Sequence, residues 1–258
     1  MLKKLFRYDF LWLMKTMPYF YLAVLASMGL TLLTNHMNDA HPGVMAWLIC
    51  DKVVSALFIF ACFAAAIITV VRIFMRFRRN FYQDESYLTH TLPVSKKVLF
   101  GSKVLASFTV EVITILVIAA CIAITMAGAA DTAWLKEVFT ADNALLCIVF
   151  LEEVLLLILC LFAGTVIGNR SEKHKTLIGV IMGILIYFAV AQVVGIGIGI
   201  TFFANSSVRL LFQESPDIEA AKEALKLVSG VCALTYAIGN AAVYLLTAKL
   251  FQKGVNVE

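Results

Sequence analysis

Three acidic side chains, Glu111, Glu152 and Glu153, fall inside long apolar runs of the sequence. An ionised carboxylate at the centre of a bilayer costs at least ~3 kcal/mol on insertion scales, so acids inside membrane segments are candidates for binding or transport. Adjacent helical positions point about 100° apart, and Glu152 and Glu153 are therefore expected to meet different surroundings. Glu153 is the first candidate to line a substrate path, followed by Glu152 and Glu111. The alternative for each is a protonated or hydrogen-bonded structural acid.

The adjacent acid pair also raises the hypothesis of an intramembrane enzyme. Membrane proteases of the CAAX-processing type carry Glu-Glu-x-x-x-Arg, but Leu157 stands at the place of the arginine. All four histidines lie outside the apolar runs, so a metal-activated water would lack imidazole ligands there. None of the six cysteines forms a Cys-x-x-Cys pair, which favours reduced packing residues. We predict no catalytic residue and no metal site in this chain.

The elements that must position these residues are membrane-spanning helices. The chain is 62% hydrophobic and 15% charged, whereas soluble domains are about half apolar and a quarter charged. Its apolar runs are continuous, unlike the alternating strands of a membrane β-barrel. We predict an all-α, polytopic membrane protein with a single transmembrane domain over residues 1–258. Since a span needs about 20 apolar residues, six spans are predicted, at residues 17–33, 53–75, 104–128, 144–168, 176–203 and 227–251.

The N-terminal segment predicts a short helix at residues 2–15. Its apolar side chains fall near one helical face, with Lys3, Lys4 and Arg7 opposite, as in a helix that lies in the membrane interface. Asp9 and Lys15 interrupt the pattern of a cleavable signal peptide. The alternative is a simple extension of the first span.

Positive charge predicts the orientation of the chain. With the N-terminus inside, sixteen of the 21 Lys and Arg side chains lie on the cytoplasmic side. Both termini and residues 82–103 are then cytoplasmic, and residues 204–226 form an extracellular extension that begins the last helix. The net charge of +4 needs no nucleic-acid partner, because basic residues at span ends face anionic lipid headgroups of the bilayer.

The cytoplasmic segment at residues 82–103, YQDESYLTHTLPVSKKVLFGSK, predicts a helix, a break and a second helix. Glu85 suits the positive end of a short helix. Pro93 disfavours helical geometry at Leu92, and Ser95 can cap a helix that runs into the third span. A solvated loop would explain the charges but not the apolar residues Tyr87 and Leu88, which need a surface to cover them. That surface could be lipid, the protein itself or a partner.

The same segment resembles the region before the third span of ABC-2-type transporter permeases, the membrane subunits of certain bacterial ABC transporters. The residues that carry this resemblance are Glu85, Tyr87, Leu88, Thr91, Leu92, Pro93, Val94 and Ser95. The topology is similar too, and the resemblance implies a type V exporter-like fold in which this segment is a coupling helix that docks into an ATPase subunit.

The resemblance further implies a bacterial plasma membrane transporter that exports a hydrophobic or amphipathic substrate, such as a peptide, lipid or drug. No Gly-x-x-x-x-Gly-Lys-Ser/Thr motif occurs, so ATP and Mg²⁺ would bind a separate ATPase chain and no cofactor is expected here. A second permease chain would complete a homodimer or heterodimer. The alternatives are an ATPase-independent channel or secondary transporter and a membrane scaffold or sensor.

Small residues predict where helices approach closely. Gly-x-x-x-Gly pairs let transmembrane helices pack backbone to backbone, either within one chain or, for the fifth span, at a subunit interface or a bend. The glycines concerned are Gly164, Gly168, Gly179, Gly183, Gly195 and Gly199.

Overall fold

The computed structural model describes residues 2–41, 43–83, 85–91, 93–129, 144–205, 208 and 218–252. Within these ranges all regular structure is helical and no strand occurs, as predicted. Six helices are long and apolar enough to cross a membrane. The prediction of an all-α protein with six apolar spans is therefore confirmed.

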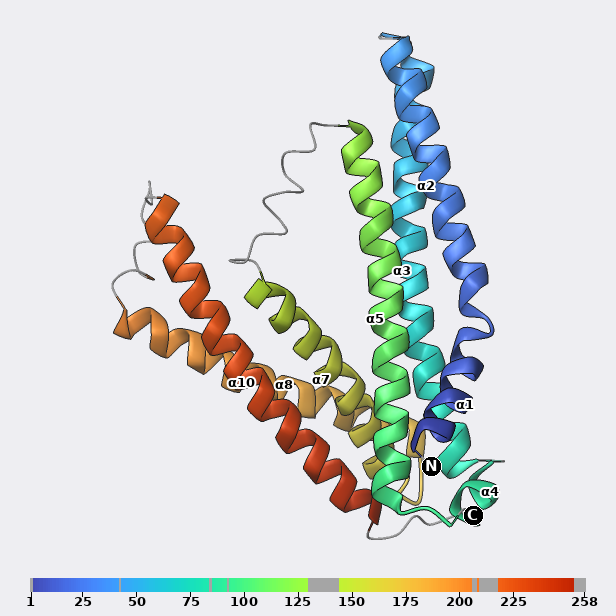
Figure 1. Cartoon of the computed structure of the whole chain (residues 1–258), viewed down its shortest axis with the longest axis vertical. Coiled ribbons are helices and arrows are strands. Elements are labelled where there is room, and N and C mark those ends of the chain that lie inside the picture. Colours follow the sequence, from blue (N-terminus) through green and yellow to red (C-terminus); the bar gives the residue numbers. More distant parts are fainter. Residues whose placement is uncertain are drawn as a thin grey trace. The chain divides into compact units, whose positions relative to one another are not determined.

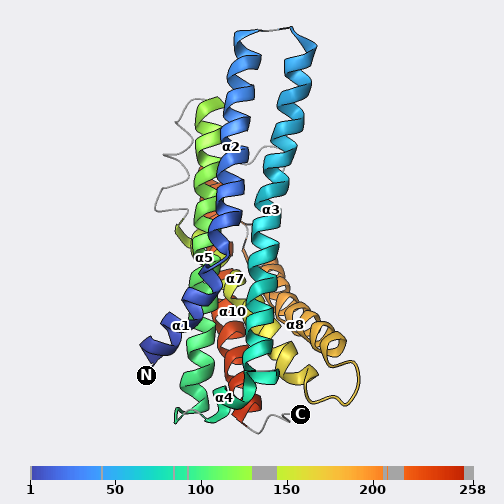
Figure 2. The ribbon, with the colours of Figure 1, turned by 90° about the vertical axis from the view of Figure 1, so that its right-hand side faces the viewer.

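The chain divides into two compact units, and unit 1 comprises Met1–Arg76 and Gly101–Glu137. Its long helices α2, α3 and α5 run alongside one another (Figures 1 and 2). An apolar core lies among them at Val24, Phe58, Cys62, Ala65 and Cys121. The helices that contribute to this unit are α1 (Leu2–Met14), α2 (Met17–Ala40), α3 (Met45–Tyr82) and α5 (Lys96–Ala129).

The N-terminal helix α1 is separate from the first apolar helix. It ends at Met14, and α2 begins at Met17 with Pro18 in its first turn, where a missing N–H is tolerated. Lys3, Lys4 and Arg7 are exposed on α1. The segment is thus a helix of its own and not a continuation of α2, while its place in the membrane interface stays a prediction.

Unit 2 comprises Phe77–Phe100 and Val138–Glu258. It holds the end of α3, the start of α5 and four further helices, of which α7 packs against both α8 and α10 (Figure 1). The last helix begins at Ile218, so the chain is helical before the predicted start of the sixth span; residues 206–207 and 209–217 of the predicted extension lie outside the described residues. These four helices are α4 (Ser86–Thr91), α7 (Ala144–Gly168), α8 (Lys175–Ala204) and α10 (Ile218–Gln252).

Four of the six motif glycines lie where α7 crosses α8. A Cβ added to Gly164 would come within 2.2 Å of the Gly179 carbonyl oxygen and 2.7 Å of the Gly183 nitrogen. A Cβ on Gly168 would meet the Lys175 carbonyl oxygen at 2.4 Å. Because both obstacles are backbone, only glycine allows the two helices this approach.

The third glycine pair has a different environment. A Cβ added to Gly195 or Gly199 on α8 would meet nothing within 4 Å. These two glycines therefore take no part in a close crossing among the described residues of the chain.

Candidate functional site

The segment between α3 and α5 contains the predicted break. Helix α4 ends at Thr91 and α5 begins at Lys96. The Leu99 amide donates to the Ser95 carbonyl at 3.1 Å, so Ser95 stands at the N-cap position of α5. The predicted pattern of helix, break and helix around Pro93 is present.

The motif residues of this segment present a mostly exposed surface. Tyr87 is 75% exposed on α4, and Thr91, Pro93 and Ser95 are exposed as well. Val94 is half-buried. Leu92 and the side chain of Leu88 lie outside the described residues.

Helix α4 is fastened to the end of α3 on its opposite side. Arg79 Nε lies 3.2 Å from Glu85 Oε1, and the Ser86 amide donates to the Gln83 carbonyl at 2.8 Å. Ser86 is buried while its neighbour Tyr87 points outward. The ion pair is partly exposed and so contributes at most about 1 kcal/mol. It orients α4 more than it stabilises the fold.

A cluster of buried aromatic rings lies in unit 2 beside this segment. Phe77, near the end of α3, stacks on Phe162 of α7 with 3.9 Å between ring centroids. Phe81 of α3 meets Phe251 of α10 edge to face at 4.6 Å. Phe100 of α5 also packs on Phe251, at 6.0 Å. All five rings are at most 1% exposed, so the helix ends that flank α4 are packed tightly against α7 and α10.

A buried ionic group holds α1 within unit 1. Asp9 of α1 is 1% exposed, and its Oδ1 accepts from Arg76 Nε of α3 at 3.3 Å and from Lys103 Nζ of α5 at 2.5 Å. The side chains of Arg76 and Lys103 are 3% and 7% exposed. One carboxylate thus joins three helices, and we call this group the Asp9 triad.

Aromatic rings of α1 cover the cations of the same region. The guanidinium carbon of Arg76 lies 4.6 Å from the Trp12 ring centroid and 5.1 Å from that of Tyr8. Arg72 also stacks on Trp12, at 4.8 Å. Cation–π contacts of this kind strengthen when desolvated.

The sequence pattern predicts only that Asp9 interrupts a signal-peptide pattern and that Arg72 and Arg76 contribute to the orientation of the chain. The triad could have been suspected because Asp9 is the one acid in an N-terminal helix whose other charged side chains are Lys and Arg.

The three acids inside the apolar helices belong to two different units. Glu153 of α7 is half-buried and accepts at Oε1 from Tyr187 Oη of α8 at 2.9 Å. Glu152 offers its backbone carbonyl to Asn240 Nδ2 of α10 at 2.9 Å. The Glu152 Oε2 atom is buried without a hydrogen-bond partner among the described residues, so the two adjacent side chains differ in their contacts. Glu111 belongs to unit 1, and the pair belongs to unit 2.

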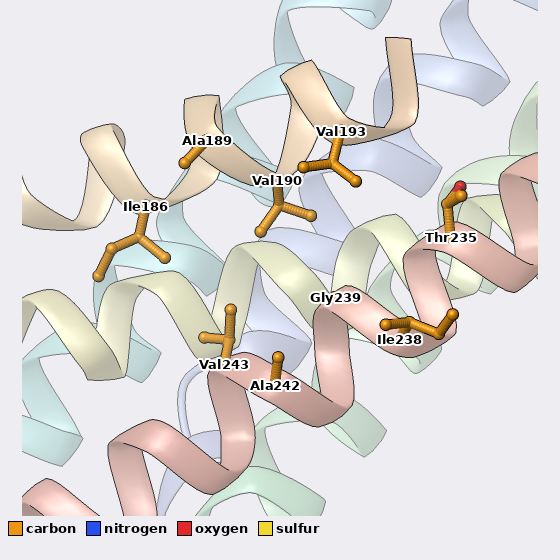
Figure 3. Close-up of a pocket in the computed structure, with 9 residues that line it drawn as sticks. All are labelled: Ile186, Ala189, Val190, Val193, Thr235, Ile238, Gly239, Ala242 and Val243. Carbon is orange, nitrogen blue, oxygen red and sulfur yellow. The ribbon is translucent and has the colours of Figure 1, made fainter. Parts of the chain in front are cut away.

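Two apolar hollows lie along α8 and α10. The first has a volume of about 380 Å³, and Figure 3 shows Val190 of α8 projecting toward Gly239 of α10 at its centre. A Cβ on Gly239 would come within 2.7 Å of Val190 Cγ1, so glycine lets the valine reach across. The second, of about 500 Å³, is lined by Gly195, Ile198, Gly199, Phe202, Val208, Leu225 and Val228.

Comparison of the chain with protein-family models, with curated proteins and with solved structures finds no significant match. The functional argument therefore rests on the residues and contacts described above.

Proposed function

We propose that this chain is the permease subunit of an ATP-driven exporter of the ABC-2 type. The observation that carries the proposal is the short helix α4, which presents Tyr87 at 75% exposure between two long apolar helices. An exposed aromatic ring outside the apolar spans can serve as an anchor for a partner surface. We assign that surface to a separate ATPase chain, which would bind ATP and Mg²⁺.

The contacts around α4 support a transmission role. A displacement of α4 would act on α3 through the pair of Arg79 and Glu85, and on α7 and α10 through the aromatic cluster of unit 2. A ring stack buried to 0–1% exposure has little freedom to absorb such a displacement. Closure of the ATPase pair on ATP would thus reach the spans as a shift of packed helices, which is the shear type of transition.

The lining of unit 2 supports the proposed class of cargo. The hollow around Val190 and Gly239 is apolar apart from the Thr235 side chain, which favours a hydrophobic or amphipathic substrate such as a peptide, lipid or drug. Glu153, bound to Tyr187, is the proposed polar contact on this path. A second permease chain, a bacterial plasma membrane and cytoplasmic termini complete the proposal.

The test is co-purification of this chain with the Walker-motif ATPase that the proposal requires. Tyr87→Asp places a charge on the proposed docking surface and is expected to lower ATPase recovery and permease-stimulated ATP hydrolysis at least tenfold, the loss typical of a disrupted anchor residue. Tyr87→Ala is expected to have a smaller effect in the same direction.

Tyr19 offers a matched control, because it is also 75% exposed but lies on α2. Tyr19→Asp should leave ATPase recovery at the wild-type level. Unchanged recovery and unchanged stimulated hydrolysis in both Tyr87 variants would refute the coupling role of α4.

A further inference from the structure

Three hydroxyl groups from three helices meet inside unit 1. Tyr21 of α2 and Thr114 of α5 have their oxygens 2.7 Å apart, and Thr69 of α3 lies 3.2 Å from the same Thr114 oxygen. Thr69 and Thr114 are at most 1% exposed. These contacts have no role in the coupling of α4.

The three hydroxyl groups of this cluster make more close oxygen–oxygen contacts than they have hydroxyl protons to donate. Thr69 and Thr114 each also lie within hydrogen-bond distance of a backbone carbonyl, of Ala65 at 2.8 Å and of Val110 at 3.0 Å. With the two contacts between hydroxyls, this makes four close oxygen pairs. Three hydroxyls supply only three protons. Because each hydroxyl oxygen carries two lone pairs, the cluster keeps lone pairs that its own three protons cannot fill.

An acid lies beside this cluster on the same face of α5. Glu111 is 5% exposed and stands three residues before Thr114, a spacing that places both on one side of a helix. It is close enough to Tyr21 for an electrostatic interaction. Among the described residues, no donor reaches its buried Oε2. An ionised carboxylate in such a position is strongly unfavourable unless its charge is neutralised.

The neighbouring cations do not neutralise Glu111. Lys103, two turns earlier on α5, donates to Asp9. Arg72, one turn beyond Thr69 on α3, stacks on Trp12 and donates to its carbonyl at 3.4 Å. Tyr21 of α2 is a titratable group that interacts electrostatically with Glu111.

We propose that Glu111, Tyr21, Thr69 and Thr114 form a binding site for one small monovalent cation, either a proton or Na⁺. Na⁺ would be held by the carboxylate and by the unfilled lone pairs of the hydroxyl oxygens, the ligands preferred by hard cations. A proton taken up from hydronium in the solvent, which leaves a water molecule, would instead form an O–H bond on the Glu111 carboxylate beside the hydroxyl cluster. The site lies wholly within unit 1 and does not depend on the proposed ATPase partner.

The first arm of the test measures Na⁺ binding to the full chain in lipid nanodiscs. Replacing choline chloride by NaCl at constant ionic strength is expected to raise Tm by about 2–4 °C if Na⁺ occupies the site. Glu111→Gln should abolish the rise, and Thr114→Val, which keeps the carboxylate, should reduce it. Glu223→Gln, on the exposed face of α10, should retain it.

The second arm detects the proton by infrared difference spectroscopy between acidic and alkaline buffer. A protonated carboxylic acid band that appears in acid, is lost in Glu111→Gln and shifts in Thr114→Val identifies the proton as the ligand. A sodium-dependent Tm with the same residue dependence identifies Na⁺. The proposal is overturned if the wild type shows neither signal, or if a Glu111 band is present but independent of pH, as for a structural acid.

Discussion

The two units hold their helices together by different means. In unit 1, polar side chains cross between helices: the Asp9 triad joins α1, α3 and α5, and the hydroxyl cluster joins α2, α3 and α5. In unit 2, α7 and α8 pack closely at Gly164 and Gly179, with no room for a Cβ atom on Gly164. Buried phenylalanines pack nearby. Lipid tails are as apolar as leucine, so helices in a bilayer need either polar contacts or close packing to associate. Among the described residues, unit 2 combines its close glycine crossing with two polar contacts between helices, from Tyr187 to Glu153 and from Asn240 to the Glu152 carbonyl.

The difference has consequences for each unit. Polar contacts can be reversed by charge or protonation, and in unit 1 they surround the proposed cation site. Close packing is sensitive to side-chain volume. Where two backbones are in contact, no flexible side chain can move aside to make room for added atoms. Substitutions that remove charge should therefore weaken unit 1, and those that add volume should weaken unit 2.

The largest effect is expected for Asp9→Ala. The substitution leaves Arg76 and Lys103 buried near each other without the carboxylate that both contact, and removing one partner of a buried ion pair costs about 3–5 kcal/mol. Hydrogen exchange followed by mass spectrometry should show faster exchange in α1 and the adjoining turns of α3 and α5, with α7 and α8 unchanged.

Two variants sharpen this result. Lys3→Ala removes an exposed cation from the same helix and should stay within about 0.5 kcal/mol of wild type. Adding Lys103→Met to Asp9→Ala should recover part of the lost stability, because one buried charge is removed. Equal exchange rates in wild type and Asp9→Ala would show that the triad does not hold α1.

An intermediate effect is expected for Gly164→Ala. The new methyl group would lie 2.2 Å from the Gly179 carbonyl oxygen, which forces α7 and α8 apart and destabilises unit 2 by about 1–3 kcal/mol. SDS titration followed by circular dichroism would measure the loss, and hydrogen exchange should place it in α7 and α8.

Gly195→Ala is the matched control, since its added methyl group meets nothing within 4 Å. It should be neutral or stabilise α8 by up to about 1 kcal/mol through better helix propensity. Equal losses in both glycine variants would contradict the assignment of the crossing to Gly164.

The smallest effect is expected for Tyr187→Phe, which deletes the one hydroxyl that donates to Glu153. Hydrogen bonds between membrane helices average about 0.6 kcal/mol, so SDS titration should detect a loss of this size. Tyr19→Phe, at an exposed position, should show none. A loss of unfolding free energy above about 2 kcal/mol would show that unit 2, like unit 1, depends strongly on polar contacts between its helices.

Local sequence features predicted the helices better than their partners. The fourth predicted span, at residues 144–168, has the same bounds as α7. The second, at residues 53–75, is shorter than α3 (Met45–Tyr82), because a hydropathy run ends where polar residues begin although the helical hydrogen bonds continue. The break at Pro93 was predictable because proline restricts the backbone of the preceding residue.

The candidate sites were only partly predictable. Glu111 and Glu153 were identified because acids are unfavourable in apolar runs. Nothing in the sequence, however, placed Tyr187 beside Glu153 or the hydroxyl cluster beside Glu111. Asp9 was missed, since it lies outside the apolar spans, where a single acid carries no such signal.

By itself, the sequence determined the class of this protein, its six apolar helices and the break between α4 and α5. Hydropathy and proline geometry are properties of neighbouring residues and need no knowledge of the fold. Only the tertiary structure decided that Asp9 pairs with Arg76, 67 residues away, and with Lys103, 94 residues away. It also decided which glycine pairs form a crossing, because pairing between distant segments depends on how whole helices pack and not on the local pattern of either segment.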